Sequence, residues 1–145
     1  MTYGHHLGIN AILSKERVTP DVLHRQNTVF RGSGGVSPEN QGYGFVPAFL
    51  DQETGTVYPA QFADGRPAPM HLLDGLPDEI VVSRHASGHI QALKPSVIAG
   101  FLRRKRFFTR EQTARALRLA ARIRARHHAE RCSAAPLHPR AETAC

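Results

Sequence analysis

The chain has 145 residues, of which 41% are apolar and 21% are charged, so it can form one modest hydrophobic core. This composition excludes a collagen-like chain, a long coiled coil and a fully disordered polyelectrolyte. No apolar run approaches the roughly 20 residues that span a bilayer. Residues 1–10 also lack the basic start and the long apolar stretch of a secretory signal. We therefore expect a cytoplasmic protein without a membrane partner.

The basic residues are concentrated at the carboxyl end. The formal net charge is +7, from 19 Lys and Arg against 12 Asp and Glu. Residues 1–102 carry seven basic and nine acidic side chains, whereas residues 103–145 carry twelve basic and three acidic ones. Such clustering is typical of proteins with an anionic partner, most often nucleic acid, although an acidic protein surface would satisfy the same field. A basic segment that only increases solubility is the alternative without a partner.

The first predicted element is a short helix that begins after Thr19. Thr19 as N-cap and Pro20 at the first helical position predict a helix over residues 21–26, followed by an extended stretch over residues 27–31. Residues 31–44 then contain five glycines, which can direct backbone N–H groups at a phosphate. They lack the Lys of a phosphate-binding loop and the spacing of a dinucleotide fingerprint. A tight connecting loop is the default interpretation.

Two pairs of short segments predict antiparallel hairpins in the middle of the chain. Residues 45–50 form an apolar run, in which Pro47 favours an edge strand or a bulge. Residues 56–62 alternate in polarity and follow a turn, so the two segments pair as a hairpin. Residues 79–83 and 89–93 form a second hairpin around a short loop that contains glycine.

Beyond residue 95 the spacing of apolar residues becomes helical. A first helix is predicted from the spacing of Val97, Ile98, Phe101 and Leu102. It ends at the basic run 103–106, because positive charge complements the carboxyl end of a helix dipole. A second helix is predicted over residues 110–128, because the preceding Thr109 and the following Gln112 form a capping box.

The second predicted helix carries a ridge of arginines. At 100° per residue four of them lie within an arc of roughly 80°: Arg115, Arg118, Arg122 and Arg126. Guanidinium groups bind phosphate oxygens in a bidentate way and keep their charge, and such contacts supply affinity but little sequence specificity. The candidate nucleic-acid-binding residues are Arg103, Arg104, Lys105, Arg106, Arg110, Arg115, Arg118, Arg122 and Arg126.

The signals for catalysis and for metal binding are weak. Asp64, His71 and Asp74 have residue types that can hold a metal for phosphodiester hydrolysis, but turn chemistry alone explains both aspartates. The histidines and cysteines near the carboxyl end match no closed four-ligand zinc pattern. We therefore assign no catalytic residue, no metal site and no cofactor, and do not expect an enzyme. A metal-dependent enzyme stays open as a second alternative.

Several stretches between residues 27 and 115 resemble a known group of sequences. They are RGSGGVS (31–37), GFVPAFLD (44–51), FADGRPAPMH (62–71), DGLP (74–77), VIAGF (97–101) and TREQ (109–112). Together they resemble uncharacterised small accessory proteins of bacterial genomic islands and integrative conjugative elements. The resemblance implies a cytoplasmic accessory role in mobile DNA and assigns no catalytic residue.

These signals together predict an α+β fold with a small antiparallel sheet over residues 45–93, two C-terminal helices and a disordered tail. The expected organisation is an N-terminal arm (1–30), a single domain that includes the basic helix (31–132) and the tail (133–145). The predicted function is that of a nucleic-acid-binding accessory protein of a mobile genetic element, acting on DNA or RNA. The alternative is a protein-interaction module, an inhibitor or adaptor of a host protein, that uses the sheet and the loop 64–76.

Overall fold

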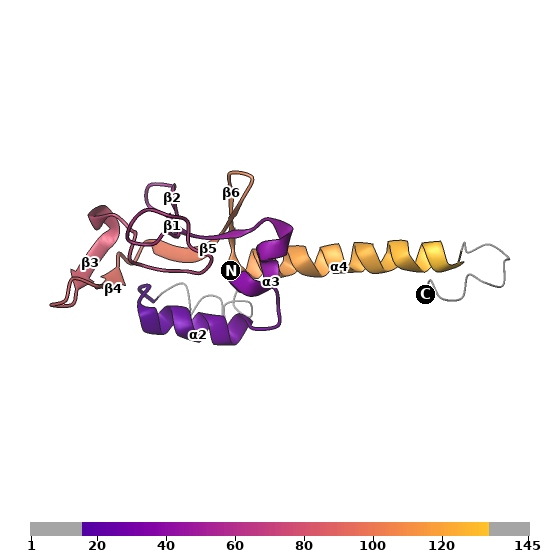
Figure 1. The fold of residues 1–145 in the computed structure, drawn as a ribbon, viewed down its shortest axis with the longest axis horizontal. Helices are drawn as coiled ribbons and strands as arrows, with labels where there is room; N and C mark the ends of the chain where they lie inside the picture. Colours follow the sequence, from indigo (N-terminus) through magenta and orange to yellow (C-terminus); the bar gives the residue numbers. More distant parts are fainter. Residues whose placement is uncertain (1–15, 134–145) are drawn as a thin grey trace, which may run out of the picture.

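The computed structural model describes residues 16–133, and it has an α+β fold with two antiparallel sheets and a long C-terminal helix (Figure 1). The elements in chain order are α2 (Pro20–Phe30), α3 (Ser37–Asn40), η2 (Gln41–Tyr43), β1 (Val46–Asp51), β2 (Thr56–Pro59), η3 (Asp78–Ile80), β3 (Val81–Arg84), β4 (Ile90–Leu93), β5 (Val97–Arg103), β6 (Arg106–Thr109) and α4 (Arg110–Ser133). The predicted fold class is thus confirmed at this level. The predicted disordered tail lies outside the described residues, apart from residue 133.

Helix α2 begins where the sequence predicts and ends later. The Thr19 side chain accepts a hydrogen bond from the backbone N–H of Val22 at 3.1 Å, as an N-cap does. The helix continues to Phe30, so the predicted extended stretch 27–31 is wrong. Its last residue, Phe30, is partly buried and its ring packs against Gly35, so tertiary packing favours the extra turn.

The main core lies between α2 and the strands. Val18 and Leu23 belong to the same buried cluster as Phe49 of β1 and Val97 of β5. The loop 64–76 closes over this cluster through three buried residues, Ala68, Leu73 and Leu76. The predicted boundary between an arm and a domain at residue 30 stays a prediction, although the segment just before it already contributes to the core.

Both predicted hairpins are confirmed, but they belong to different sheets. Strands β1 and β2 lie in a four-stranded sheet of order β2-β1-β5-β6, while β3 and β4 form a two-stranded sheet of their own. Strand β1 is therefore central, and the predicted edge position is wrong. Pro47 is tolerated there because its carbonyl accepts from Ala60 N at 2.9 Å, on the side where the pairing with β2 ends at Pro59. The backbone nitrogen of Pro47, which has no hydrogen, also points to this side, so no hydrogen bond of the β1–β2 pairing is lost.

The predicted helix over residues 97–102 is wrong, because this segment is strand β5. It pairs antiparallel with β1, with Ala99 opposite Phe49, and then turns back into β6. Val97, Ala99 and Phe101 alternate along the strand and are all buried. Apolar residues at positions 97, 98, 101 and 102 fit either period, and β-branched and aromatic side chains favour the strand. The described residues up to 133 therefore contain one C-terminal helix, α4, and the sheet extends to residue 109.

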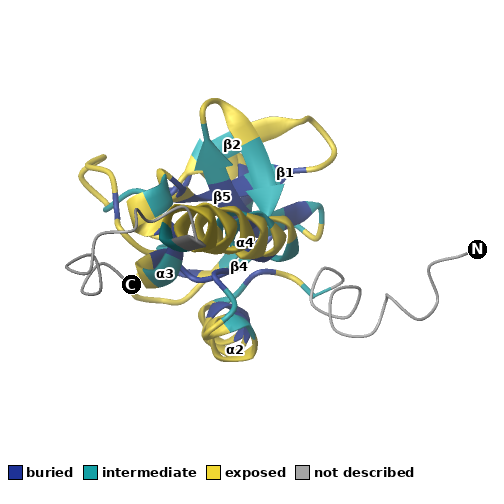
Figure 2. Cartoon of the chain, turned by 90° about the vertical axis from the view of Figure 1, so that its right-hand side faces the viewer, coloured by how far each residue is buried: buried dark blue, intermediate teal, exposed yellow. Residues whose placement is uncertain are grey.

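Helix α4 begins at the predicted capping box. Gln112 N donates to Thr109 Oγ1 at 3.0 Å, and Thr109 N donates to Gln112 Oε1 at 2.9 Å. The first turns are anchored by Thr113 and Ala114, which are buried. Every residue from 121 to 131 is exposed, and this part of α4 projects from the body in Figure 1 and is seen end-on in Figure 2. Within residues 16–133, no helix combines the length and the apolar character needed to cross a membrane.

Candidate nucleic-acid interface

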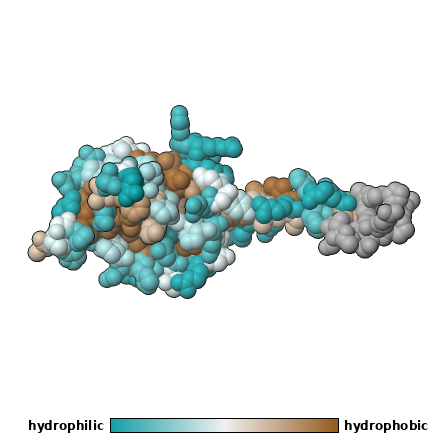
Figure 3. Space-filling view, viewed as in Figure 1, coloured by the Kyte–Doolittle hydropathy of each residue, from teal (hydrophilic) through white to brown (hydrophobic). Residues whose placement is uncertain are grey.

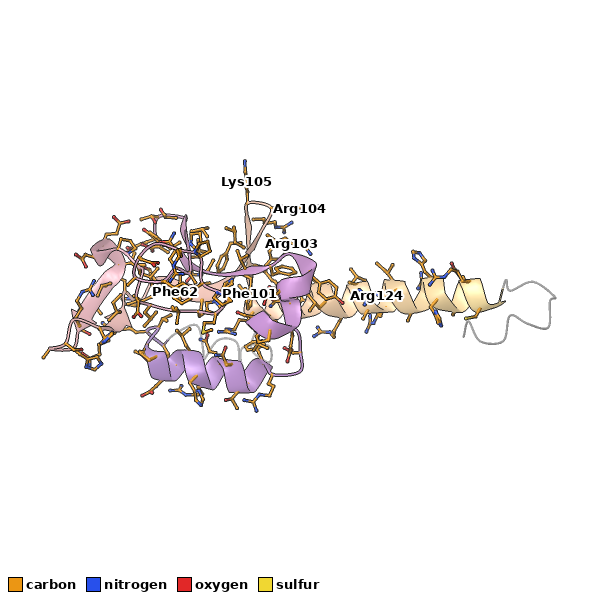
Figure 4. The ribbon with its side chains drawn as sticks, viewed as in Figure 1. Phe62, Phe101, Arg103, Arg104, Lys105 and Arg124 are labelled. Atoms are coloured by element: carbon orange, nitrogen blue, oxygen red, sulfur yellow. The ribbon has the colours of Figure 1, made fainter. Side chains whose placement is uncertain are left out.

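The basic run 103–106 forms the tight turn between β5 and β6. Arg104 and Lys105 have φ angles of 52° and 68°. The left-handed conformation costs a non-glycine residue roughly 1–2 kcal/mol, and Asn-Gly is the usual choice for such two-residue turns. Figure 4 shows both side chains at the projecting tip of the hairpin. Two cations thus occupy strained positions at an exposed tip, and strain of this kind often marks a functional segment.

Aromatic rings hold the two arginines that flank this tip. The Arg103 guanidinium lies 4.3 Å from the centre of the Phe45 ring and 5.4 Å from that of Phe108. The Arg106 guanidinium lies 5.2 Å from the Phe108 ring. Cation–π contacts orient a guanidinium without neutralising it. The rings therefore place these charges while leaving them available to an anion.

The ridge arginines of α4 are exposed, as predicted: Arg115, Arg118, Arg122 and Arg126. Arg115 lies 4.0 Å from the carboxylate of Glu111, one turn earlier. Arg118 and Arg122 have no carboxylate within that distance among residues 16–133. The predicted positive ridge is thus present in the projecting part of the helix.

An apolar pair lies beside the ridge. Leu119 and Ile123 are 57% and 47% exposed, and they lie one helical turn apart. Figure 3 shows hydrophobic surface on the projecting part of α4 among hydrophilic residues. The exposed face of α4 therefore combines guanidinium groups with two large apolar side chains.

Arg124 is a basic residue that the ridge does not include. It lies about 180° around the helix from Arg115 at 100° per residue. Its guanidinium donates to Tyr43 Oη at 3.1 Å and lies 5.6 Å from the centre of that ring. Arg124 thus ties the middle of α4 back to η2. In the sequence, only the position of Arg124 on the side of the helix opposite the ridge indicates that it contacts the body.

Arg110 does not belong to the basic surface, and we remove it from the candidate set. Arg110 is only 3% exposed, and a buried guanidinium group cannot contact a phosphate backbone. It donates to Gln26 Oε1 at 3.1 Å, to the Gly35 carbonyl at 2.9 Å and to His71 Nδ1 at 3.2 Å. No carboxylate lies within 4.0 Å of it among the described residues. Burial lowers the pKa of Arg110 to about 10.

His71, which is half-buried, is the neutral partner of the buried Arg110. Its Nε2 lies 2.7 Å from the Gly100 carbonyl, which only accepts, so Nε2 carries the proton. Its Nδ1 is then the acceptor for the Arg110 guanidinium. Burial, and secondly the charge of Arg110, lower the pKa of His71 to about 3. The imidazole therefore stays neutral at physiological pH.

We expect acid to destabilise the protein through His71. The folded-state pKa lies below the unfolded value of 6.5, so only the unfolded chain gains this proton as the pH falls from 6.5 towards 3. The loss approaches 1.4 kcal/mol per pH unit, or about 2 kcal/mol at pH 5. Urea unfolding at pH 7.5 and pH 5.0 measures it against His71→Gln, which keeps a donor and an acceptor but does not titrate. Equal losses in both proteins would contradict this assignment.

The glycine-rich loop already holds an anion from its own chain. The backbone N–H groups of Gly32 and Gly34 each donate to the Glu39 carboxylate at 2.8 Å. Asn40 Nδ2 donates to the Gly34 carbonyl at 2.9 Å. The donors that a phosphate would need are therefore engaged, and the segment is a tight connecting loop.

The fold does not bring together Asp64, His71 and Asp74, the three residues considered above as metal ligands. Asp64 pairs with Arg66 at 2.7 Å, and Asp74 lies 3.9 Å from His89. His71 is engaged in the cluster described above. Within residues 16–133, no group of three or more His, Cys, Asp or Glu is placed to hold a metal ion.

Comparisons with protein-family models, with curated proteins and with solved structures found no match for this chain. Function is therefore inferred from the geometry. Of the nine candidate basic residues, seven are exposed, Arg103 is partly buried against aromatic rings and Arg110 is buried.

Proposed function

We propose that the protein binds nucleic acid through phosphate contacts made by the β5–β6 turn and by the ridge of α4. One observation carries the proposal: within residues 16–133, most cations of the two segments lack a carboxylate partner, Arg115 beside Glu111 being an exception. No described carboxylate lies within 4.0 Å of five of them, namely Arg104, Lys105, Arg106, Arg118 and Arg122. A polyanion would supply the counter-charge that the described part of the chain does not.

The projecting part of α4 supports the same proposal. Isolated helices shorter than about 12–15 residues are marginal in water, and most helices in proteins are stabilised by tertiary packing. Residues 121–131 are all exposed, although Arg124 reaches Tyr43, so a partner would cover helix surface that the body leaves exposed. Packing against a second copy would bring the guanidinium groups of Arg118 and Arg122 close to others like them. Charge therefore favours an anionic partner.

Contacts of this kind give little discrimination between sequences, because they go to the phosphate backbone. We therefore propose weak sequence specificity. The accessory role in a mobile genetic element rests on the sequence resemblance alone, and the salt experiment below does not depend on it.

The affinity for nucleic acid is expected to depend steeply on salt. About five phosphate contacts give a slope near −4.5 in a plot of log affinity against log salt, or a loss of roughly 500-fold between 50 and 200 mM. Fluorescence anisotropy with a labelled duplex and a labelled single strand measures both. An affinity that does not change with salt, or no binding at 50 mM, would contradict the proposal.

A protein-interaction module is the second candidate, and exposed Leu119 and Ile123 favour it. A partner with an acidic rim and an apolar centre would fit the face that they share with the ridge. The loop 64–76 adds little to this candidate, because Ala68, Leu73 and Leu76 are buried in the core. Absence of oligonucleotide binding at low salt would favour this candidate over the first.

A further inference from the structure

A hollow of about 370 Å³ lies between α2, α3 and the segment before β3 that contains His71. Residues that line it include Asn27, Arg31, Val36, Ser37, Met70 and His71. Its volume is within the range of small-molecule sites, roughly 300–1,000 Å³. None of the residues that form the proposed nucleic-acid surface lines it, so the two sites are separate (α2 and α3 are labelled in Figure 1).

Two of its polar groups are without a partner in the described part of the chain. Ser37 is 6% exposed, and its hydroxyl makes no hydrogen bond there although it borders the hollow. The hydroxyl is not one of the buried side-chain atoms that lack a partner, so its oxygen is open to solvent, and a ligand can engage it in place of water. The Arg31 side chain likewise has no carboxylate within 4.0 Å, and no acidic residue lines the hollow.

A second positive charge lies behind the wall of the hollow. The buried Arg110 guanidinium is bonded to His71, which lines the hollow. Its other two acceptors, Gln26 and Gly35, are chain neighbours of lining residues. Neutral acceptors satisfy the donors of a buried guanidinium but do not cancel its charge. Arg31 and Arg110 thus bring two positive charges near the hollow, whereas the nearby Glu39 carboxylate is already held by the N–H groups of Gly32 and Gly34.

We propose that this hollow binds a small organic carboxylate with an apolar body. The carboxylate accepts hydrogen bonds from the Arg31 guanidinium and the Ser37 hydroxyl, because charge-assisted bonds of this kind are strong. The apolar body packs against Val36 and Met70. This proposal goes beyond nucleic-acid binding and does not depend on it.

A phosphate group matches this hollow less well than a carboxylate. Phosphate sites usually combine several backbone N–H groups in one concave loop. The nearest such donors, those of Gly32 and Gly34, are occupied by Glu39. The donors that remain are two side chains, which suit the two oxygens of a carboxylate.

An NMR titration of the full chain with phenylacetate and with hexanoate tests the proposal. At least one of them should cause saturable shifts in the backbone amides of Val36 and Ser37 and in the methyl group of Met70. Phenylacetamide, which has the same shape without the charge, should bind at least about fivefold more weakly. The proposal is overturned if neither acid causes such shifts, if acid and amide bind equally, or if inorganic phosphate binds more tightly than both acids.

Two variants locate the anion, and a third controls for net charge. Arg31→Gln and Ser37→Ala should each weaken binding of the acid by at least about threefold, whereas Arg104→Gln, at the distant hairpin tip, should leave it unchanged. Ser37→Ala removes a hydroxyl without a partner, so its melting temperature should match that of the wild type. Equal effects of Arg31→Gln and Arg104→Gln would overturn the assignment, because they would show a response to net charge alone.

Discussion

Replacement of Arg115, Arg118 and Arg122 by Gln together is expected to weaken duplex binding by roughly 100-fold or more at 0.1 M salt. Each arginine that neutralises one phosphate adds about 0.9 to the slope of log affinity against log salt. The slope should therefore fall by about 1.8 through Arg118 and Arg122, and by up to about 2.7 if Arg115 exchanges Glu111 for a phosphate. Glutamine is a good helix former, so α4 itself should persist. Anisotropy titrations at several salt concentrations, with circular dichroism for helicity, provide the measurement.

The matched control removes three charges from arginines that the chain itself neutralises. These are Arg25, Arg66 and Arg84, which pair with Glu16, Asp64 and Asp78. Their combined replacement by Gln leaves the ridge intact, so the affinity should change less than about threefold and the slope should persist. Similar losses in the two triple variants would show that net charge, and not the ridge, determines binding.

Local signals in the sequence predicted the starts of α2 and α4 and the two hairpins correctly. The N-cap at Thr19 and the capping box of Thr109 and Gln112 involve hydrogen bonds that span three residues, so the chain specifies them without its tertiary structure. The turn at Gly88, with a φ of 95°, is specified in the same way. These features depend on neighbouring residues alone.

Pairings between distant segments decided where the sequence predictions were wrong. Residues 97–102 fit a helix as well as a strand, and the register with β1 selects the strand. The basic run after them became a turn as a consequence. Arg104, Lys105 and Arg106 are exposed, as candidates for phosphate contacts have to be, but the strained backbone and the contacts with Phe45 and Phe108 were not predicted.

The candidate site shows the same limit at a single residue. Arg110 precedes the ridge and has the same chemistry, so no local pattern separates it from its neighbours. Its burial depends on partners 39, 75 and 84 residues away in the chain. A residue type with a strong preference for the surface was therefore assigned to the surface. The sequence does not show that hydrogen bonds to these distant partners stabilise Arg110 in a buried position.

Arg110→Met is expected to lower the free energy of unfolding by about 3–5 kcal/mol. The variant leaves Gln26 Oε1, the Gly35 carbonyl and His71 Nδ1 without their donor, and each unsatisfied buried group costs about 1–3 kcal/mol. Removal of a buried charge offsets part of this cost, so the net effect lies below the simple sum. Urea unfolding at pH 7.5 measures the difference.

Two further variants separate the hydrogen-bond cluster from the packing of the α4 segment. Arg115→Met, five residues along the same helix but exposed, should change stability by less than about 0.5 kcal/mol. Arg110→Lys should be intermediate, because an ammonium group keeps the charge but lacks the fork that reaches three acceptors. If Arg110→Met is as stable as Arg115→Met, Thr113 and Ala114 alone anchor the helix. If Arg110→Met is less stable than Arg115→Met, Arg110 anchors the start of α4 and so fixes the direction in which the helix leaves the body. The buried charge of Arg110 then positions the exposed arginines of the ridge.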